Sequence, residues 1–197
     1  MSSTVELTSQ PTSQARRRYT YDELAAELEE TNQLHELWDG ELIMAPSPFF
    51  HHQKVAFRFQ QALNEWVEAR QLGEVVGAPM DMVLSTHCMV QPDVAFISRE
   101  RLDIIQNQIR GAADLVAEVI SLGGRTRDRI EKRDLYEQYG VKEYWIIDPE
   151  PQTVEVLCLI NSRYELAMRC GPGDTARSRL LPGFEDNVAW LFRGGDH

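Results

Sequence analysis

Asp114-Leu-Val-Ala-Glu-Val-Ile120 is an aliphatic run of the length and composition that favour a buried β-strand. Glu118 stands in the middle of this run as a carboxylate among apolar side chains. Burying an unpaired charge costs several kcal/mol or forces a large pKa shift, so Glu118 requires a cation or a hydrogen-bond network. The run therefore predicts both a buried strand and a polar site within it.

The residues that follow complete a strand–helix–strand unit. Residues 126–139 have helical periodicity, and Gly140 comes next, where a glycine suits a helix C-cap. Residues 142–148, Lys-Glu-Tyr-Trp-Ile-Ile-Asp, have the composition of the next buried strand. A strand, a helix and a strand in this order predict a parallel pair joined by a right-handed crossover.

Shorter elements are predicted on both sides of this unit. Thr20-Tyr-Asp-Glu23 has the spacing of a capping box before a short helix, and Asp39-Gly40 is typical of a hairpin turn. A long helix over residues 49–71 is predicted to be capped by Gly73. The remaining predictions are strands at 74–76, 80–84 and 90–97, a short helix near 99–109, a hairpin over 153–168 that turns at Asn161-Ser162, and a helical stub at 188–192. Together they predict an α/β (α+β) fold, with a mixed central β-sheet flanked by α-helices.

Length and composition indicate an ordinary globular protein. The 197 residues suffice for one hydrophobic core, so residues 19–197 are expected to form a single domain. Residues 1–18 are rich in Ser, Thr and Gln and are expected to be a disordered tail. No apolar run reaches the roughly 18–20 residues that cross a bilayer, so no membrane association is expected. The three cysteines lack metal-type spacing, which favours reduced thiols in a cytoplasmic protein.

The formal net charge of −11 argues against a nucleic-acid-binding role. Proteins that bind phosphates usually have a basic balance, because neutralising phosphates supplies most of the non-specific affinity. Local basic clusters do occur at residues 16–18 and 125–133. A nuclease site also needs carboxylates, so the charge weakens a nuclease hypothesis without excluding it.

Asp93, Glu118 and Lys132 are the candidate catalytic residues. If the strand after Asp93 neighbours the strand of Glu118, the two carboxylates could hold one Mg²⁺ ion. Lys132 shares a helix face with Leu135 and Tyr136, which should face the sheet, so Lys132 should point toward Glu118. Such a set suits metal-dependent phosphodiester hydrolysis, in which the metal activates water and the lysine stabilises the developing charge.

Each supporting residue also has a plainer explanation. An Asp that follows Pro, as Asp93 does, is common as a turn or cap residue. Asp128 and Lys132 could form an ordinary i,i+4 ion pair on a solvated edge, worth roughly 0.2–0.5 kcal/mol. His52 could cap the long helix or simply be exposed. Glu36, beside the first hairpin turn, could reach the metal site or pair across the hairpin.

Several motifs follow one another in an order shared with a known family. They are His35-Glu-Leu-Trp-Asp-Gly-Glu-Leu42, Pro46-Ser-Pro48 before a His-containing helix, Gln91-Pro-Asp-Val-Ala95, Ala117-Glu-Val-Ile-Ser121, Asp128-Arg-Ile-Glu-Lys-Arg-Asp-Leu-Tyr136 and Gly140-Val-Lys-Glu-Tyr-Trp-Ile-Ile-Asp148. Over residues 20–192 this order resembles the Uma-type family of predicted restriction endonucleases, a domain of unknown function in the PD-(D/E)XK nuclease superfamily. The resemblance implies a restriction-endonuclease-like fold and a Mg²⁺ site at Asp93 and Glu118, with Mn²⁺ as an alternative ion.

The resemblance also accounts for the position of the lysine. In this family the motif lysine is moved from the strand to the helix, which matches Lys132, whereas the strand position two after Glu118 is Ile120. Relatives commonly have Ser-Pro-Ser-Thr where this chain has Ser121-Leu-Gly-Gly124. The resemblance implies DNA as the partner, and cleavage of both strands would favour a homodimer, because a two-fold protein matches a two-fold duplex.

The sequence is therefore consistent with two functions. The first is a Mg²⁺-dependent endonuclease that hydrolyses DNA phosphodiester bonds. The second is a catalytically inactive nuclease-fold module that binds nucleic acid or protein. The complete set of Asp93, Glu118 and Lys132 favours the enzyme, whereas the net charge of −11 favours the inactive module.

Overall fold

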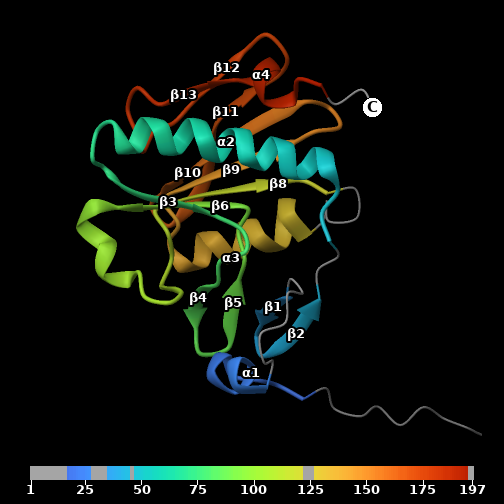
Figure 1. Cartoon of the computed structure of the whole chain (residues 1–197), viewed down its shortest axis with the longest axis vertical. Helices are drawn as coiled ribbons and strands as arrows, with labels where there is room; N and C mark the ends of the chain where they lie inside the picture. Colours follow the sequence, from blue (N-terminus) through green and yellow to red (C-terminus); the bar gives the residue numbers. More distant parts are fainter. Residues whose placement is uncertain (1–16, 28–34, 45–46, 122–126, 195–197) are drawn as a thin grey trace, which may run out of the picture.

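Two β-sheets and two longer helices are stacked in layers in the computed structural model (Figure 1). Helix α2 (Phe50–Glu68) covers one face of the larger sheet, and α3 (Lys132–Tyr139) lies on the other face, toward the smaller sheet. The structure describes residues 17–27, 35–44, 47–121 and 127–194, without the side chains of Arg127 and Asp128.

The larger sheet has six strands in the order β11-β10-β9-β8-β6-β3. Their bounds are β3 Gly73–Gly77, β6 Val94–Ser98, β8 Leu115–Val119, β9 Glu143–Asp148, β10 Thr153–Ile160 and β11 Arg163–Cys170. Strands β8 and β9 are parallel, and the other neighbours are antiparallel. The predicted strand–helix–strand unit and the mixed sheet flanked by helices are thus confirmed.

The smaller sheet has five strands in the order β2-β1-β5-β4-β7. Their bounds are β1 His35–Trp38, β2 Glu41–Met44, β4 Met82–Ser85, β5 Cys88–Val90 and β7 Ile109–Arg110. The predicted first hairpin is present, and its turn residues Asp39 and Gly40 have φ of 46° and 82°. This hairpin extends the smaller sheet and not the central one.

The prediction of one strand over residues 90–97 is wrong, because these residues belong to two strands that lie in different sheets. Strand β5 ends at Val90 in the smaller sheet, and β6 begins at Val94 in the larger one. Pro92 stands between them and has no N–H to donate to a strand ladder, so the chain leaves one sheet there before it enters the other. The break leaves Asp93 directly before β6.

The capping predictions are confirmed at two helices. Helix α1 (Tyr21–Glu27) opens with a capping box, in which Thr20 N donates to the Glu23 carboxylate at 2.8 Å and Glu23 N donates to Thr20 Oγ1 at 3.2 Å. Gly140 caps α3 in the left-handed conformation with φ of 81°. A π-helical turn, η2 (Arg127–Glu131), precedes α3.

The prediction that Gly73 caps α2 is wrong, because the helix ends at Glu68 and its C-cap is Ala69. Gly73 instead opens β3 opposite Ser98, with φ of +151°. A Cβ at this position would lie 2.0 Å from the carbonyl oxygen of Ile97. Only glycine allows the backbones of β3 and β6 to approach this closely.

Other local predictions were too coarse. The helix expected near residues 99–109 is a 3₁₀ helix, η1 (Arg99–Ile104), followed by β7. Two other predictions are confirmed. The hairpin of β10 and β11 turns at Asn161-Ser162. The helical stub at residues 188–192 is helix α4 (Val188–Phe192). A short hairpin of β12 (Thr175–Arg177) and β13 (Glu185–Asn187) was missed.

Each face of the larger sheet carries its own apolar core. On one face, Val55, Phe59 and Leu63 of α2 are fully buried, and the ring of Phe59 packs on Trp145 with centroids 5.0 Å apart. On the other face, Tyr136 of α3 packs among residues of both sheets. Within the described part of the chain, no helix is long and apolar enough to span a membrane.

The predicted N-terminal tail is tested only at its end. Residues 1–16 lie outside the described residues, so disorder there stays a prediction. Arg17 and Arg18 are described, and their guanidinium groups pair with Glu27 and Asp39. These two residues are therefore attached to the domain that follows.

Candidate active site

The candidate site lies where β8 ends, β6 begins and the first turns of α2 pass above them (Figure 1). Val94 of β6 is paired with Ala117 of β8, which brings Asp93 opposite Glu118. Oδ2 of Asp93 accepts a hydrogen bond from the Val119 N–H at 2.7 Å. The prediction that the two carboxylates come from neighbouring strands is confirmed.

Lys132 points from the first turn of α3 toward Glu118, as its helix face predicted. Its Nζ lies 2.9 Å from Oε1 of Glu118 and 3.1 Å from Oε1 of Glu36, and the residue is only 6% exposed. Burial of an ammonium requires such counter-charges, because desolvation disfavours the charged form. Two carboxylates thus hold one buried cation.

Tyr136, one turn after Lys132, is a member of the site that the sequence interpretation assigned only to packing. Its hydroxyl donates to Oε1 of Glu118 at 2.6 Å. Burial, and then the negative charge of Glu118, raise the pKa of Tyr136 well above its usual value, so the phenol stays protonated and donates. The i,i+4 spacing from Lys132 was the signal that could have identified it.

Glu36 reaches the site from β1 of the smaller sheet. Besides Lys132, its carboxylate accepts hydrogen bonds from Trp38 Nε1 at 3.0 Å and from the Gln91 N–H at 3.3 Å. The residue is 5% exposed. Glu36 therefore reaches the site, and its neighbour across the hairpin is the uncharged Ile43. Lys132 contacts a carboxylate from each of the two sheets, Glu36 from the smaller and Glu118 from the larger.

His52 lies beside Asp93. Its Nε2 is 3.2 Å from Oδ2 of Asp93, and both side chains are largely buried. Capping does not explain this residue, because α2 begins after Phe49 without any side-chain cap. His52 therefore contacts Asp93 from the first turn of α2.

Two predictions fall where the structure gives no side chains. Asp128 belongs to the π-helical turn η2, but its side chain lies outside the described atoms, so its i,i+4 pair with Lys132 is untested. Residues 122–126, which hold most of the Ser121–Gly124 loop, also lie outside the described residues.

Asp93 and Glu118 suit a hard divalent cation such as Mg²⁺. Among the described residues, no three or more His, Cys, Asp or Glu side chains gather into a metal-binding group. Mg²⁺ does not require one, since it binds through one or two carboxylates and keeps waters or phosphate oxygens as its other ligands. The contacts given above use Oδ2 of Asp93 and Oε1 of Glu118, one oxygen of each carboxylate.

The fold also occurs in a solved structure. A crystal structure titled as "a putative nuclease belonging to DUF820 from Anabaena variabilis ATCC 29413" is similar to this chain with a TM-score of 0.73 and 20% sequence identity. The match covers 88% of this chain and 97% of the other, which confirms the predicted restriction-endonuclease-like fold class.

No curated protein matches the chain. A family match, in contrast, extends over residues 19–189, nearly the whole described region, and includes Glu36, Asp93, Glu118 and Lys132. The chain therefore belongs to the Uma2 family, which is described as "Putative restriction endonuclease".

Proposed function

We propose that this protein is a Mg²⁺-dependent endonuclease that hydrolyses DNA phosphodiester bonds. The observation that carries the proposal is the buried Lys132 ammonium, 2.9 Å from a Glu118 carboxylate that lies opposite Asp93 on the neighbouring strand. Two carboxylates and a lysine are the groups that metal-dependent phosphodiester hydrolysis needs. Membership of the Uma2 family supports nuclease chemistry in general.

Asp93 and Glu118 would hold the Mg²⁺ ion, and Mn²⁺ could replace it. When bound, the ion supplies a polarised phosphate and a water of lowered pKa. His52 and the Val119 N–H hold Asp93 in place, while Tyr136 holds Glu118. Pre-orientation of this kind spares the site the cost of reorganising during the reaction.

Lys132 has an electrostatic role in this proposal. Its ammonium is fixed beside Glu118 in a dry environment, where a positive charge stabilises a developing phosphoryl charge more strongly than in water. Glu36 places a second carboxylate against the ammonium and limits its rotation. Glu36 is therefore a positioning residue, and Lys132 is the residue that meets the substrate.

A cleavage assay tests the proposal directly. Purified protein is incubated with duplex DNA at low salt with Mg²⁺, with Mn²⁺ or with EDTA. We expect metal-dependent cleavage that Asp93→Asn and Glu118→Gln each abolish, and that Lys132→Met slows by about 10²–10³-fold. Asp103→Asn is the matched control, because this exposed carboxylate lies in η1, beyond the opposite end of β6, and its variant should cleave normally.

The inactive binding module remains the second candidate because of the net charge of −11. Thermal melting separates the two functions. An active site should give a Mg²⁺- or Mn²⁺-dependent rise in Tm that Glu118→Gln removes. An inert wild-type protein with no metal-dependent stabilisation would favour the module. Cleavage of both strands would also call for a homodimer, which light scattering of the purified protein can test.

A further inference from the structure

The outer face of α2 exposes phenylalanine rings that the core does not use. Phe49 and Phe50 are 72% and 77% exposed, and Phe57 is 56% exposed. Phe50 and Phe57 are separated by seven residues, so they lie on one face of the helix, opposite the buried Val55 and Phe59. Large apolar side chains gathered on a surface in this way mark an interaction site.

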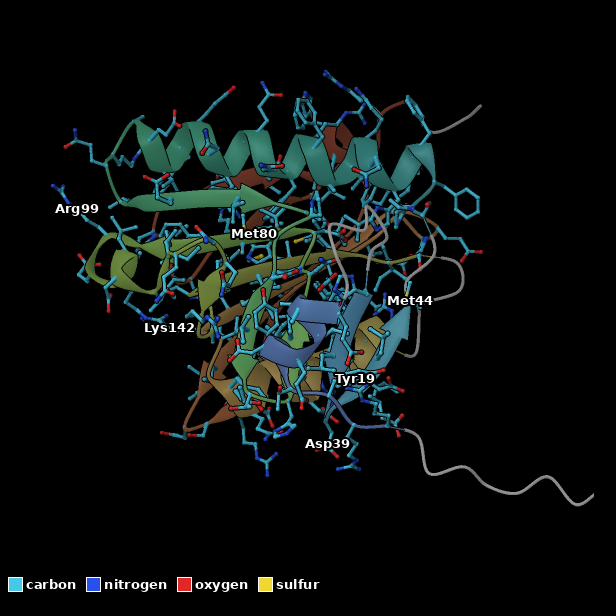
Figure 2. The ribbon with its side chains drawn as sticks, turned by 60° about the horizontal axis from the view of Figure 1, so that its bottom comes forward. Tyr19, Asp39, Met44, Met80, Arg99 and Lys142 are labelled. Atoms are coloured by element: carbon cyan, nitrogen blue, oxygen red, sulfur yellow. The ribbon has the colours of Figure 1, made fainter. Side chains whose placement is uncertain are left out.

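Exposed aromatic residues occur on only one half of this helix. Farther along the same outer face, the exposed residues are Gln61, Glu65 and Glu68, and all three are polar. The aromatic half is the half that carries His52, whose imidazole contacts Asp93. Figures 1 and 2 show α2 on the surface of the molecule, above the larger sheet, and Figure 2 shows side chains projecting from it.

The charge of this half differs from that of the whole chain. The sequence contains 31 acidic residues, yet none lies between Glu41 and Glu65. Lys54 stands between the exposed rings, with its Nζ 5.8 Å from the centroid of the Phe57 ring. A second basic residue, Arg58, follows Phe57, but its guanidinium donates to the backbone carbonyls of Leu191 and Arg193. A locally basic, aromatic surface on an acidic protein complements a ligand that has both phosphates and rings.

We propose that this aromatic face, made of Phe49, Phe50, Lys54 and Phe57, binds single-stranded nucleic acid, with unpaired bases stacked on the phenylalanine rings and a phosphate at Lys54. A phenyl ring has no hydrogen-bonding group to read a base edge in a duplex, but it stacks on any base that is unpaired. Duplex binding would rest on many phosphate contacts, which the net charge of −11 does not favour.

The inference rests on the proposed function, because it names the form of DNA, single-stranded or duplex, that the active site would receive. His52 follows Phe50 by two residues at the same end of α2, with its side chain turned inward to Asp93, so a strand held on the aromatic face lies at the helix end nearest the carboxylates. The substrate class is then single-stranded DNA or a locally unpaired region of a duplex.

Fluorescence anisotropy in EDTA tests the binding without cleavage. The probes are a labelled oligothymidylate and a blunt duplex of the same length. We expect the wild-type protein to prefer the single strand, and the double variant Phe50→Ala/Phe57→Ala to bind it at least about tenfold more weakly, since two bases lose the rings on which they stack. Leu166→Ala is the matched control, because Leu166 is an equally exposed apolar side chain on β11, and its variant should bind normally.

The outcomes separate this inference from the proposed function. Unchanged oligothymidylate binding in the double variant would overturn the inference, as would a wild-type preference for the duplex. A wild-type dimer that the double variant converts to a monomer, with no change in binding per chain, would assign the face to a second copy. Loss of strand binding by the variant, together with a wild-type protein that never cleaves, would support the aromatic face and refute the nuclease.

Discussion

Glu118 and Glu143 are two buried carboxylates on the adjacent parallel strands β8 and β9, and the chain satisfies them in different ways. Glu143 accepts hydrogen bonds from neutral donors: Ser178 Oγ at 2.6 Å, the N–H of Arg179 at 2.6 Å, the N–H of Leu180 at 2.8 Å and Trp145 Nε1 at 2.8 Å. Glu118 accepts from the side chains of Lys132 and Tyr136. Two of the Glu143 donors are thus backbone N–H groups, whereas Lys132 and Tyr136 donate to Glu118 from side chains.

The two residues also lie at different ends of their strands. Glu143 opens β9 opposite Leu115, whereas Glu118 is near the end of β8. Figure 2 shows Lys142, the neighbour of Glu143, on the side of the molecule away from Met44 at the end of β2. Backbone donors cannot leave Glu143 unless the chain moves, so this carboxylate ties the 178–180 segment to the sheet. Lys132 and Tyr136 donate to Glu118 from side chains, so replacing either contact by a ligand requires no movement of the backbone.

The largest expected effect is on stability at Glu143. Glu143→Ala would remove the acceptor of the buried Ser178 hydroxyl and of the part-buried N–H groups of Arg179 and Leu180. We expect the free energy of unfolding to fall by about 3–5 kcal/mol. Urea denaturation followed by circular dichroism measures the change. Glu165→Ala on β11, which removes an exposed carboxylate, should stay within about 0.5 kcal/mol of wild type, and an equal loss in both variants would contradict a special role for Glu143.

The next effect concerns the cation at Glu118. Lys132→Met leaves two buried carboxylates, Glu36 and Glu118, facing each other without their shared ammonium. We expect a loss of about 2–4 kcal/mol in the free energy of unfolding. The double variant Lys132→Met/Glu118→Gln should recover part of that loss, because it removes one of the two charges. Additive losses in this double-mutant cycle would show that Lys132 and Glu118 do not interact as described.

The strand–helix–strand unit and the placement of Lys132 could be predicted because both depend on local periodicity. Glu118 could be singled out because a lone carboxylate in an apolar run needs a partner. Glu143, between Lys142 and Tyr144, is a second buried carboxylate, but the sequence interpretation treated that run only as a buried strand. Its partners come from the 178–180 segment, which no local pattern connects to β9.

The contributions of Glu36 and His52 to the site could be suspected but not predicted. Glu36 reaches Lys132 because the smaller sheet packs against α3, and that packing joins strands far apart in the sequence. The division of residues 90–97 between two sheets, which places Asp93 opposite Glu118, is likewise a tertiary property. Local pattern therefore predicts which side chains need partners, whereas the topology decides which partners they find.

Asp186 extends the comparison to a carboxylate with an incomplete set of donors. The residue is 6% exposed, and within the described residues its Oδ2 has no hydrogen-bond partner. Burial raises the pKa of Asp186 to about 7, and this outweighs the opposing hydrogen bond from the Asn187 N–H. The folded protein therefore binds this proton more tightly than the unfolded chain does, whose Asp pKa is about 4.

The sign of the pH dependence follows from that difference. The contribution of Asp186 to stability is fully present below the unfolded pKa and is lost as the pH rises through about 7. We expect Asp186→Asn to be more stable than wild type by about 1–3 kcal/mol near pH 8, with a difference that shrinks toward acid pH. Denaturant melts across the pH range measure it, with Asp103→Asn as the exposed control. A pH-independent difference would refute the titration of Asp186.

The smallest effects come from removing one hydroxyl donor from each of the first two carboxylates. Tyr136→Phe deletes the hydrogen bond to Glu118, and Ser178→Ala deletes one to Glu143. Each should lower the free energy of unfolding by about 1 kcal/mol, because the other donors remain. In metal-dependent melting, however, the two variants should differ. Tyr136→Phe should change the Tm shift caused by Mn²⁺, since the phenol shares Oε1 of Glu118 with Lys132, whereas Ser178→Ala should leave that shift as in wild type. Equal metal responses in both variants would show that the end of β8 is no more open to a ligand than the start of β9.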